Sequence, residues 1–261
     1  MPGFSTDAIL LRKIEYGDHD FIISFLTRSH GKISVIAKNA KKSVRRFTGA
    51  LDLFSVNQIH CVYPKKKKDG MTILFQADLE DGLGNIRYDV LKTTYASFWV
   101  ELIHFWLEEE KPQLTLYDLL FFSLDALNTG SISKEVIHLL FMIRFMALSG
   151  FEPQIESCGR CKTPLDEIEQ NRVMFDFREG RIICLNCAKG ESKHGRMVSK
   201  GTLKQLFWIN QNEVHRVDRI KFSGLAIKEG EALLESFIPF HLGREFKSLQ
   251  FLKRLRQNNE F

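Results

Sequence analysis

The chain has 261 residues, of which 44% are hydrophobic and 26% charged, and its formal net charge is +5 at pH 7. This length and composition allow two or three small buried cores and argue against disorder. No run of eighteen apolar residues occurs, and residues 1–5 lack the pattern of a signal peptide. We therefore expect a cytoplasmic protein without a membrane span.

The charge is distributed unevenly along the chain. Residues 1–80 carry a net +5, residues 81–157 a net −6, residues 158–187 zero and residues 188–261 a net +6. Residues 28–68 hold eleven Lys or Arg against a single acid, Asp52. Closely spaced cations of this kind can neutralise the phosphates of a nucleic acid.

Residues 1–80 are expected to form strands, because apolar and polar residues alternate between turn signals. Five short strands are predicted over residues 8–16, 21–27, 32–38, 54–63 and 71–80. The alternation places Phe75 in the core and leaves Phe47 and Phe54 as candidates for stacking on bases. Five strands in about eighty residues suit an OB-fold β-barrel, whose strand face and loops bind oligonucleotides.

After residues 82–84 the period of the apolar residues becomes helical. A stripe from Tyr88 to Phe105 predicts a helix of about six turns, which ends before Pro112. Further helices are predicted over residues 115–128, 133–149, 199–210, 225–237 and 245–256. The helix over 133–149 is apolar on most sides, so it should lie inside a bundle.

Four of the five cysteines form two C-x2-C pairs, Cys158 with Cys161 and Cys184 with Cys187, separated by 22 residues. Two such turns facing each other can supply four thiolates to a tetrahedral zinc ion. A hairpin is expected between the pairs, over residues 172–177 and 181–184. Because four thiolates leave no open position, one zinc ion here should be structural and not catalytic.

Other interpretations of the cysteines are weaker. Disulfides do not suit a reducing compartment, and redox activity requires a thioredoxin-like βα turn that the sequence lacks. His194 can replace a ligand, but a solvent-exposed histidine is the simpler interpretation. Cys61, in a strand context, is expected to be a packed side chain.

The expected fold class is α+β. It has an OB-fold domain over residues 1–80, a helical domain over 81–157 and 188–261, and an inserted four-cysteine zinc ribbon-like module over 158–187. The main predicted phosphate-binding segment is residues 38–46, which follow a strand directly. Lys65 to Lys68 fit a solvated loop at least as well as a DNA contact.

Over nearly its whole length the sequence resembles the bacterial recombination mediator family RecO. The resemblance rests on residues 16–20 (YGDHD), 27–32 (TRSHGK), 37–43 (AKNAKKS), 51–54 (LDLF) and 243–248 (GREFKS), together with the cysteine pairs. Asp18 stands where the family usually has Glu, and Asn39 where it usually has Gly. Asn tolerates a left-handed backbone, so the turn at Asn39 can survive.

The resemblance implies a non-enzymatic protein that binds single- and double-stranded DNA and anneals complementary strands. It further implies that the protein engages single-strand-binding protein and acts with RecR to load RecA. We expect two basic surfaces to bind DNA, one on the barrel and one near the end of the chain. The predicted DNA-binding residues are Arg28, Lys32, Lys38, Lys41, Lys42, Arg45, Arg46, Arg244, Lys247, Lys253 and Arg254.

Two other functions stay open from the residues alone. A zinc-dependent nuclease or deaminase would need an open metal site with a histidine and a general-acid glutamate, and the H-x-E signature of deaminases is absent. A zinc-ribbon adaptor that binds RNA would carry the same cations, because phosphates of the two polymers are alike. Competition between DNA and RNA oligomers would separate this second function from DNA binding.

Overall fold

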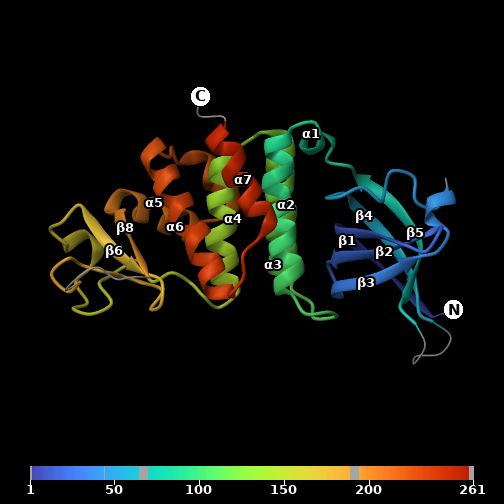
Figure 1. Cartoon of the computed structure of the whole chain (residues 1–261), viewed down its shortest axis with the longest axis horizontal. Coiled ribbons are helices and arrows are strands. Elements are labelled where there is room, and N and C mark those ends of the chain that lie inside the picture. Colours follow the sequence, from blue (N-terminus) through green and yellow to red (C-terminus); the bar gives the residue numbers. More distant parts are fainter. Residues whose placement is uncertain (1, 44, 65–69, 189–193, 259–261) are drawn as a thin grey trace. The chain divides into compact units, whose positions relative to one another are not determined.

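The computed structural model describes residues 2–43, 45–64, 70–188 and 194–258 (Figure 1). The chain divides into two compact units, residues 1–128 with 251–261, and residues 129–250. The helices that were expected in one helical domain are thus distributed over both units. The domain boundaries predicted from the sequence stay predictions. Among the described residues, no helix is long and apolar enough to cross a bilayer.

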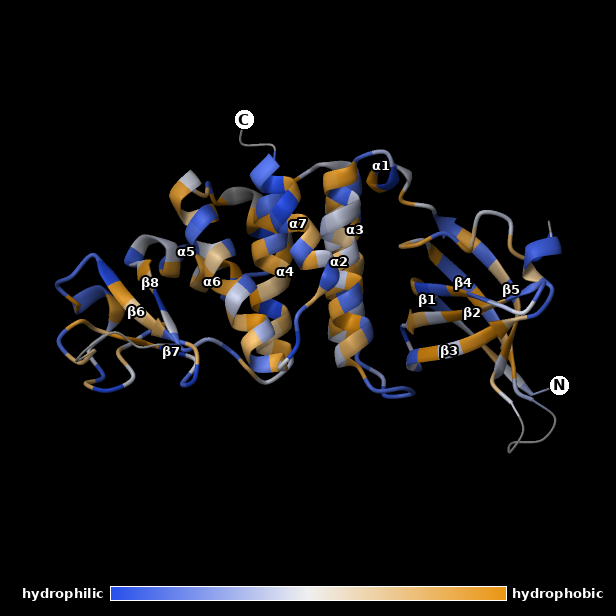
Figure 2. Cartoon of the chain, in the orientation of Figure 1, coloured by the Kyte–Doolittle hydropathy of each residue, from blue (hydrophilic) through white to orange (hydrophobic). Residues whose placement is uncertain are grey.

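A closed five-stranded barrel forms the first part of the N-terminal unit. Its strands are β1 (Gly3–Tyr16), β2 (Asp20–Thr27), β3 (Gly31–Ala37), β4 (Val56–Val62) and β5 (Thr72–Asp81). Their order around the barrel is β1-β2-β3-β5-β4, with β3 and β5 parallel and the other pairs antiparallel. Hydrophobic residues lie along each of these strands among more hydrophilic ones (Figure 2). The predicted OB-type barrel is confirmed.

The barrel core contains the expected alternating residues of β3, Ile33, Val35 and Ala37, all buried. The prediction for Phe75 is wrong, because its side chain is 55% exposed. Cys61 of β4 pairs with Leu74, whereas His60 pairs with Gln76, so Phe75 has no partner in the register. This β-bulge moves Phe75 to the outside and leaves Leu74 in the core.

The segment between β3 and β4 completes the barrel core. Asn39 takes a left-handed φ of 54° and precedes a short 3-10 helix, η1 (Ala40–Lys42). Its backbone N–H donates to Asp20 Oδ1 at 2.7 Å, which joins the segment to the start of β2. Phe47 and Phe54, the two predicted stacking residues, are instead buried.

Three helices follow the barrel in the N-terminal unit. They are α1 (Gly84–Arg87), α2 (Val90–Trp106) and α3 (Leu114–Thr129). Asp89 caps α2 by accepting from the N–H groups of Leu91 and Lys92. The middle of the predicted stripe, Tyr95, Phe98 and Leu102, is buried, which confirms that it packs.

The turn after α2 attaches these helices to strand β3. Lys32 pairs with Glu109, and its carbonyl oxygen accepts from Glu110 N–H at 2.8 Å. The Lys32 Nζ donates to the carbonyl oxygen of His104, at the end of α2, at 2.9 Å. Gly31 has a φ of +71°, and a Cβ there would lie 2.1 Å from the carbonyl oxygen of Lys111. Only glycine fits this approach.

The second unit contains four helices and a small sheet. The helices are α4 (Lys134–Leu148), α5 (Lys200–Gln211), α6 (Gly224–Leu242) and the start of α7 (Lys247–Asn258). Two 3-10 turns, η2 (Leu165–Glu167) and η3 (Val214–Arg219), lie between them. The sheet has the order β7-β6-β8, from β6 (Arg172–Asp176), β7 (Arg181–Ile183) and β8 (Gly195–Ser199).

Helix α4 is buried on most of its sides, as its sequence predicted. Ser133 caps its first turn by accepting from Val136 N–H. Inside the bundle, His138 Nε2 of α4 lies 3.1 Å from Glu235 Oε1 of α6, and both side chains are buried. This pair satisfies two polar groups that would otherwise be costly to bury.

The contact at Gly31 leads to a stability prediction. Gly31→Ala should lower the free energy of unfolding by about 2 to 5 kcal/mol, from left-handed strain and from collision with the backbone of Lys111. Gly17→Ala is the matched control, because Gly17 has a φ of +57° but nothing within 4 Å of its Cβ position. The control should lose only about 1 to 2 kcal/mol, from strain alone. Urea unfolding measures both, and equal losses would contradict the role given to the turn after α2.

Candidate metal centre and nucleic-acid interface

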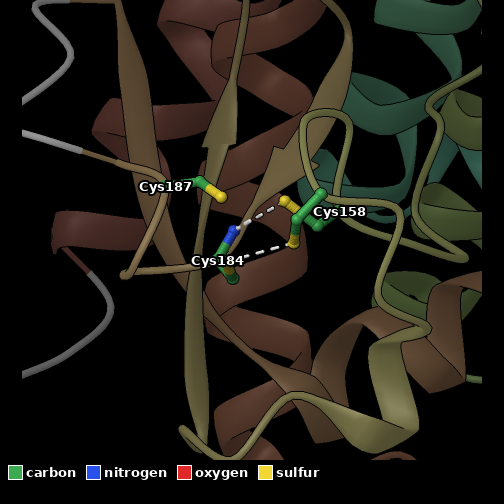
Figure 3. Close-up of side chains that lie close together, drawn as sticks. Cys158, Cys184 and Cys187 are labelled. Carbon is green, nitrogen blue, oxygen red and sulfur yellow. Dashed lines mark hydrogen bonds between the residues drawn. The ribbon is translucent and has the colours of Figure 1, made fainter.

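The four paired cysteines gather at one end of the small sheet. Their sulfur atoms all lie within 4.8 Å of one another. Cys161 Sγ is 3.7 Å from Cys184 Sγ. Cys158, Cys184 and Cys187 lie close together (Figure 3). Zn–S bonds of roughly 2.3 Å in a tetrahedron place sulfur atoms about 3.8 Å apart. The arrangement therefore fits a tetrahedral ion bound by four thiolates.

Tight backbone turns hold each pair of sulfur atoms in place. Lys162, with a left-handed φ of 63°, donates its N–H to the carbonyl oxygen of Cys158 at 2.9 Å. Cys187 donates to the carbonyl oxygen of Cys184 at 3.0 Å. Cys184 N–H also donates to Cys158 Sγ at 3.4 Å, which connects the two turns directly.

The ionisation of the clustered thiols favours a bound cation. The hydroxyl and backbone of Thr163 lower the pKa of Cys161 to about 6, so this thiol ionises readily. The neighbouring thiols Cys184 and Cys161 raise the pKa of Cys187 to about 12. Four thiolates this close repel one another, and a bound divalent cation would remove that repulsion.

The hairpin expected between the cysteine pairs is confirmed. Met174 of β6 pairs with Ile183 of β7, and Asp176 accepts from two N–H groups of the turn. The sequence analysis missed β8, which pairs along the other edge of β6. Its five residues follow residues 189–193, which the structure does not describe, and its apolar pattern is too short to be distinctive.

Glu229 of α6 connects this sheet to the helices. Its carboxylate accepts from Ser199 N–H at 2.9 Å and from Thr202 Oγ1 at 2.7 Å, and lies 2.8 Å from Arg172. Burial raises its pKa, but the bonds from Ser199 and Thr202 and the charge of Arg172 outweigh burial, so the pKa is lowered. The metal module is thus anchored to the helical bundle.

The two remaining candidates, His194 and Cys61, are not part of the cysteine cluster. The backbone carbonyl of His194 accepts from Phe177 N–H, and the His194 ring lies 5.8 Å from the Phe240 ring. His194 does not belong to the cluster of sulfur atoms. Cys61 is buried in the barrel, and burial raises its pKa to about 12, so its thiol is an inert packed group.

The segment over residues 38–46 divides into paired and unpaired cations. Lys41 Nζ lies 2.8 Å from Glu15 Oε2. Arg46 donates to the carbonyl oxygen of Lys38 at 2.6 Å, and its guanidinium overlies the Phe47 ring at 4.7 Å. In contrast, the exposed side chains of Lys38, Lys42 and Arg45 make no ion pair with any residue that the structure describes.

The barrel surface at Lys38 is hollowed. A groove of about 400 Å³ is lined by Tyr16, Ile22, Ile36, Lys38, Pro64, Gly70, Met71 and Ile73. Tyr16 is 54% exposed, so its ring can be reached from solvent. The groove combines apolar walls with one cation, which suits a nucleobase and its phosphate. Lys65 to Lys68 lie outside the described residues.

Arg28 and Lys32 are less available than the sequence indicated. Arg28 lies 3.9 Å from Asp118, and its guanidinium overlies the Tyr117 ring. Lys32 is only 8% exposed and contacts α2, so its ammonium group does not face solvent. It belongs to the packing of the barrel against its helices.

The structure adds two cations that the sequence analysis did not select. Arg12 and Lys13 follow a bulge in β1, and both are exposed. Lys13 Nζ lies 5.3 Å from the centre of the Phe21 ring, which Lys41 also overlies at 5.7 Å. In the sequence, Arg12 and Lys13 are a basic pair at the end of an apolar strand. They were not selected because the more numerous cations of residues 28–68 dominate the charge of this region.

The cations predicted near the end of the chain lie in or just before α7. Arg244 overlies the Phe246 ring at 5.9 Å, and Lys247, Lys253 and Arg254 are exposed. Arg256, which was not among the predicted DNA-binding residues, donates from Nη2 to the Tyr95 hydroxyl at 3.0 Å. α7 therefore carries both packing residues and solvent-facing cations.

An OB-type barrel with exposed cations, together with a separate four-cysteine cluster, is the architecture of a nucleic-acid-binding protein. Two family profiles match the chain, Recombination protein O N terminal over residues 1–83 and Recombination protein O C terminal over residues 87–250. The chain therefore belongs to the RecO family of DNA repair and recombination proteins.

Proteins named DNA repair protein RecO are similar to the chain over nearly their whole length. That of Desulfatibacillum aliphaticivorans is 42% identical over 99% of this chain and 100% of its own length. That of Desulfosudis oleivorans is 37% identical over 98% and 99%. The protein of Bacillus pumilus is 27% identical over 96% and 93%.

Replacing one cluster cysteine tests the metal site. Cys184→Ser should remove most of the bound metal and lower the melting temperature, because metal binding contributes folding free energy. Cys61→Ser should keep the metal, since Cys61 lies in the barrel. Elemental analysis and thermal unfolding measure the two properties. A Cys184→Ser protein with the metal content of the parent would rule out the proposed ligand set.

Charge reversal tests the barrel surface. Lys42→Glu with Arg45→Glu should weaken DNA binding at least about tenfold at low salt, because two unpaired cations become repulsive. The paired residues Lys41 and Arg46 are left unchanged to preserve the fold. The matched control, Lys162→Glu with Arg178→Glu, changes the net charge equally in the metal module. Fluorescence anisotropy with a labelled oligomer measures affinity, and equal losses in both proteins would contradict a local site.

Proposed function

We propose that this protein is a recombination mediator that binds single- and double-stranded DNA and anneals complementary strands. With RecR, it helps to load RecA onto DNA coated with single-strand-binding protein. The observation that carries the proposal is the barrel groove lined by the unpaired cation Lys38, with the unpaired cations Lys42 and Arg45 a few residues further along the same segment. Membership of the RecO family supports the DNA-repair setting.

In this proposal, annealing needs no catalytic group. Two strands repel each other through their phosphates, and protein cations that neutralise those phosphates lower this repulsion. The barrel would bind one strand through the groove and through Lys38, Lys42, Arg45 and the exposed Arg12. The solvent-facing cations of α7 would bind a second strand, and base pairing would then drive the reaction.

We infer that the metal of the cysteine cluster is one zinc ion with a structural role. Four thiolates are the donor set that zinc prefers in structural sites, and they leave no position for water or substrate. When bound, the ion cross-links the two cysteine turns. Cys158, Cys161, Cys184 and Cys187 would hold it, while Glu229 attaches the module to α6.

The proposed setting is the bacterial cytoplasm, where single-strand-binding protein, RecR and RecA act on DNA. The relatives are named DNA repair protein RecO, which supports this setting. An RNA-binding adaptor would use the same cations, so matched DNA and RNA oligomers belong in the test.

An annealing assay on complementary strands coated with single-strand-binding protein tests the function. The protein should speed pairing, and the effect should fall steeply as salt rises, because phosphate contacts release counterions. The Lys42→Glu, Arg45→Glu protein should lose most of this effect. Binding to RNA without acceleration of DNA pairing would favour the adaptor. Cleavage of labelled DNA by the metal-loaded protein would contradict a non-enzymatic role.

A further inference from the structure

Helix α7 carries an exposed aromatic side chain that its packing does not require. The apolar side of the helix, Phe246 with Leu249 and Leu252, is fully buried. Phe251 lies away from this side and is 49% exposed. An exposed aromatic ring flanked by cations is a feature of surfaces that stack on bases.

The neighbours of Phe251 on the helix surface are Lys247, Ser248, Arg254 and Leu255, so two of the four are cations. Lys247 precedes it by four residues and Arg254 follows it by three, so all three side chains share one face of the helix. Both cations are exposed, and neither makes an ion pair or side-chain hydrogen bond with any residue in the described part of the chain. Arg256, by contrast, is bound to Tyr95.

The same spacing occurs elsewhere in the chain with the opposite charge. Phe105 of α2 is 38% exposed, with Glu101 four residues before it on the helix and Glu108, paired with Lys111, three residues after it and just beyond the helix end at Trp106. A phosphate would be repelled there and attracted at Phe251. The chain thus provides its own control for the effect of charge around an exposed ring.

We propose that Phe251 stacks on an unpaired nucleobase while Lys247 and Arg254 bind the phosphates on either side of it. The ligand is single-stranded DNA, because its bases offer free faces, whereas stacking inside a duplex requires the base pairs to separate first. The stripe Lys247–Phe251–Arg254 therefore makes α7 selective for unpaired strands. This inference rests on the proposed function, since it takes DNA as the ligand.

Two features favour single-stranded DNA as the ligand: the positive charge of the stripe and its single aromatic ring. One positive charge of the stripe lies about one helical turn before the ring, and the other about one turn after it. This spacing is close to that between a base and the phosphates on either side of it. An acidic peptide segment is the competing ligand. It would engage the cations but gain nothing from a free base, and this difference can be measured.

Oligomers with and without bases test the proposal. The parent protein should bind a single-stranded oligomer about tenfold more tightly than an abasic oligomer of equal length and charge, in line with stacking of about one base. Phe251→Ala should lose the part of this preference that α7 contributes and keep only what the barrel groove contributes, whereas Phe251→Tyr should keep all of it. Phe105→Ala should behave like the parent. Affinity for a duplex should be nearly the same in all four proteins.

The possible outcomes separate this inference from the proposed function. If Phe251→Ala keeps the whole preference for bases while Lys42→Glu with Arg45→Glu loses DNA binding, the stripe is not a stacking site and the barrel function stands. If the parent protein binds no DNA, both fail. If Phe251→Ala binds DNA normally but loses an acidic protein partner, α7 is a protein-docking helix and the inference is overturned. If Phe251→Ala does not fold, Phe251→Tyr takes its place in the comparison with the abasic oligomer. Phe251→Tyr must then keep the preference for the oligomer with bases.

Discussion

Closure of the barrel depends on a short parallel pairing between β3 and β5. Val35 pairs with Thr72 and Ile36 with Ile73, and these are the described pairs that join the two strands. The pairing brings Ile36 and Ile73 together in the wall of the groove, with Lys38 and Met71 beside them. Without it, two strand edges would expose unpaired backbone groups and the groove would lose a wall. The groove on the barrel is therefore a consequence of how the sheet closes.

The sequence was informative where the signal is local. Alternation located the five strands, and the spacing of the cysteines predicted the cluster that the structure brings together. Predictions from the sequence failed where long-range contacts determine the position of a side chain. The bulge that exposes Phe75 depends on its register with β4, and the burial of Lys32 depends on a turn more than seventy residues away. No local pattern distinguishes a lysine that binds phosphate from one that caps a distant helix.

The two candidate sites divide stability and recognition between them. The cysteine cluster lies in a module fixed by the ladder between β6 and β8 and by the carboxylate of Glu229. The barrel instead offers cations that no described carboxylate neutralises, such as Lys42 and Arg45. Unpaired positive charge repels itself, and a protein tolerates it when a polyanion is to be bound. Neutral packing surrounds the cysteine cluster, whereas the barrel surface carries excess positive charge. The two sites are therefore expected to have different roles.

The last helix returns to the unit in which the chain began. Residues 251–258 of α7 belong with residues 1–128, and Arg256 bonds the hydroxyl of Tyr95 in α2. Residues 129–250 are thus an insertion in the order of translation. On the ribosome, the barrel and its first helices emerge well before the segment that completes them. Tyr95 can therefore bond with Arg256 only after that last segment has been synthesised. The N-terminal unit reaches its final packing only after synthesis has passed through the whole of the other unit.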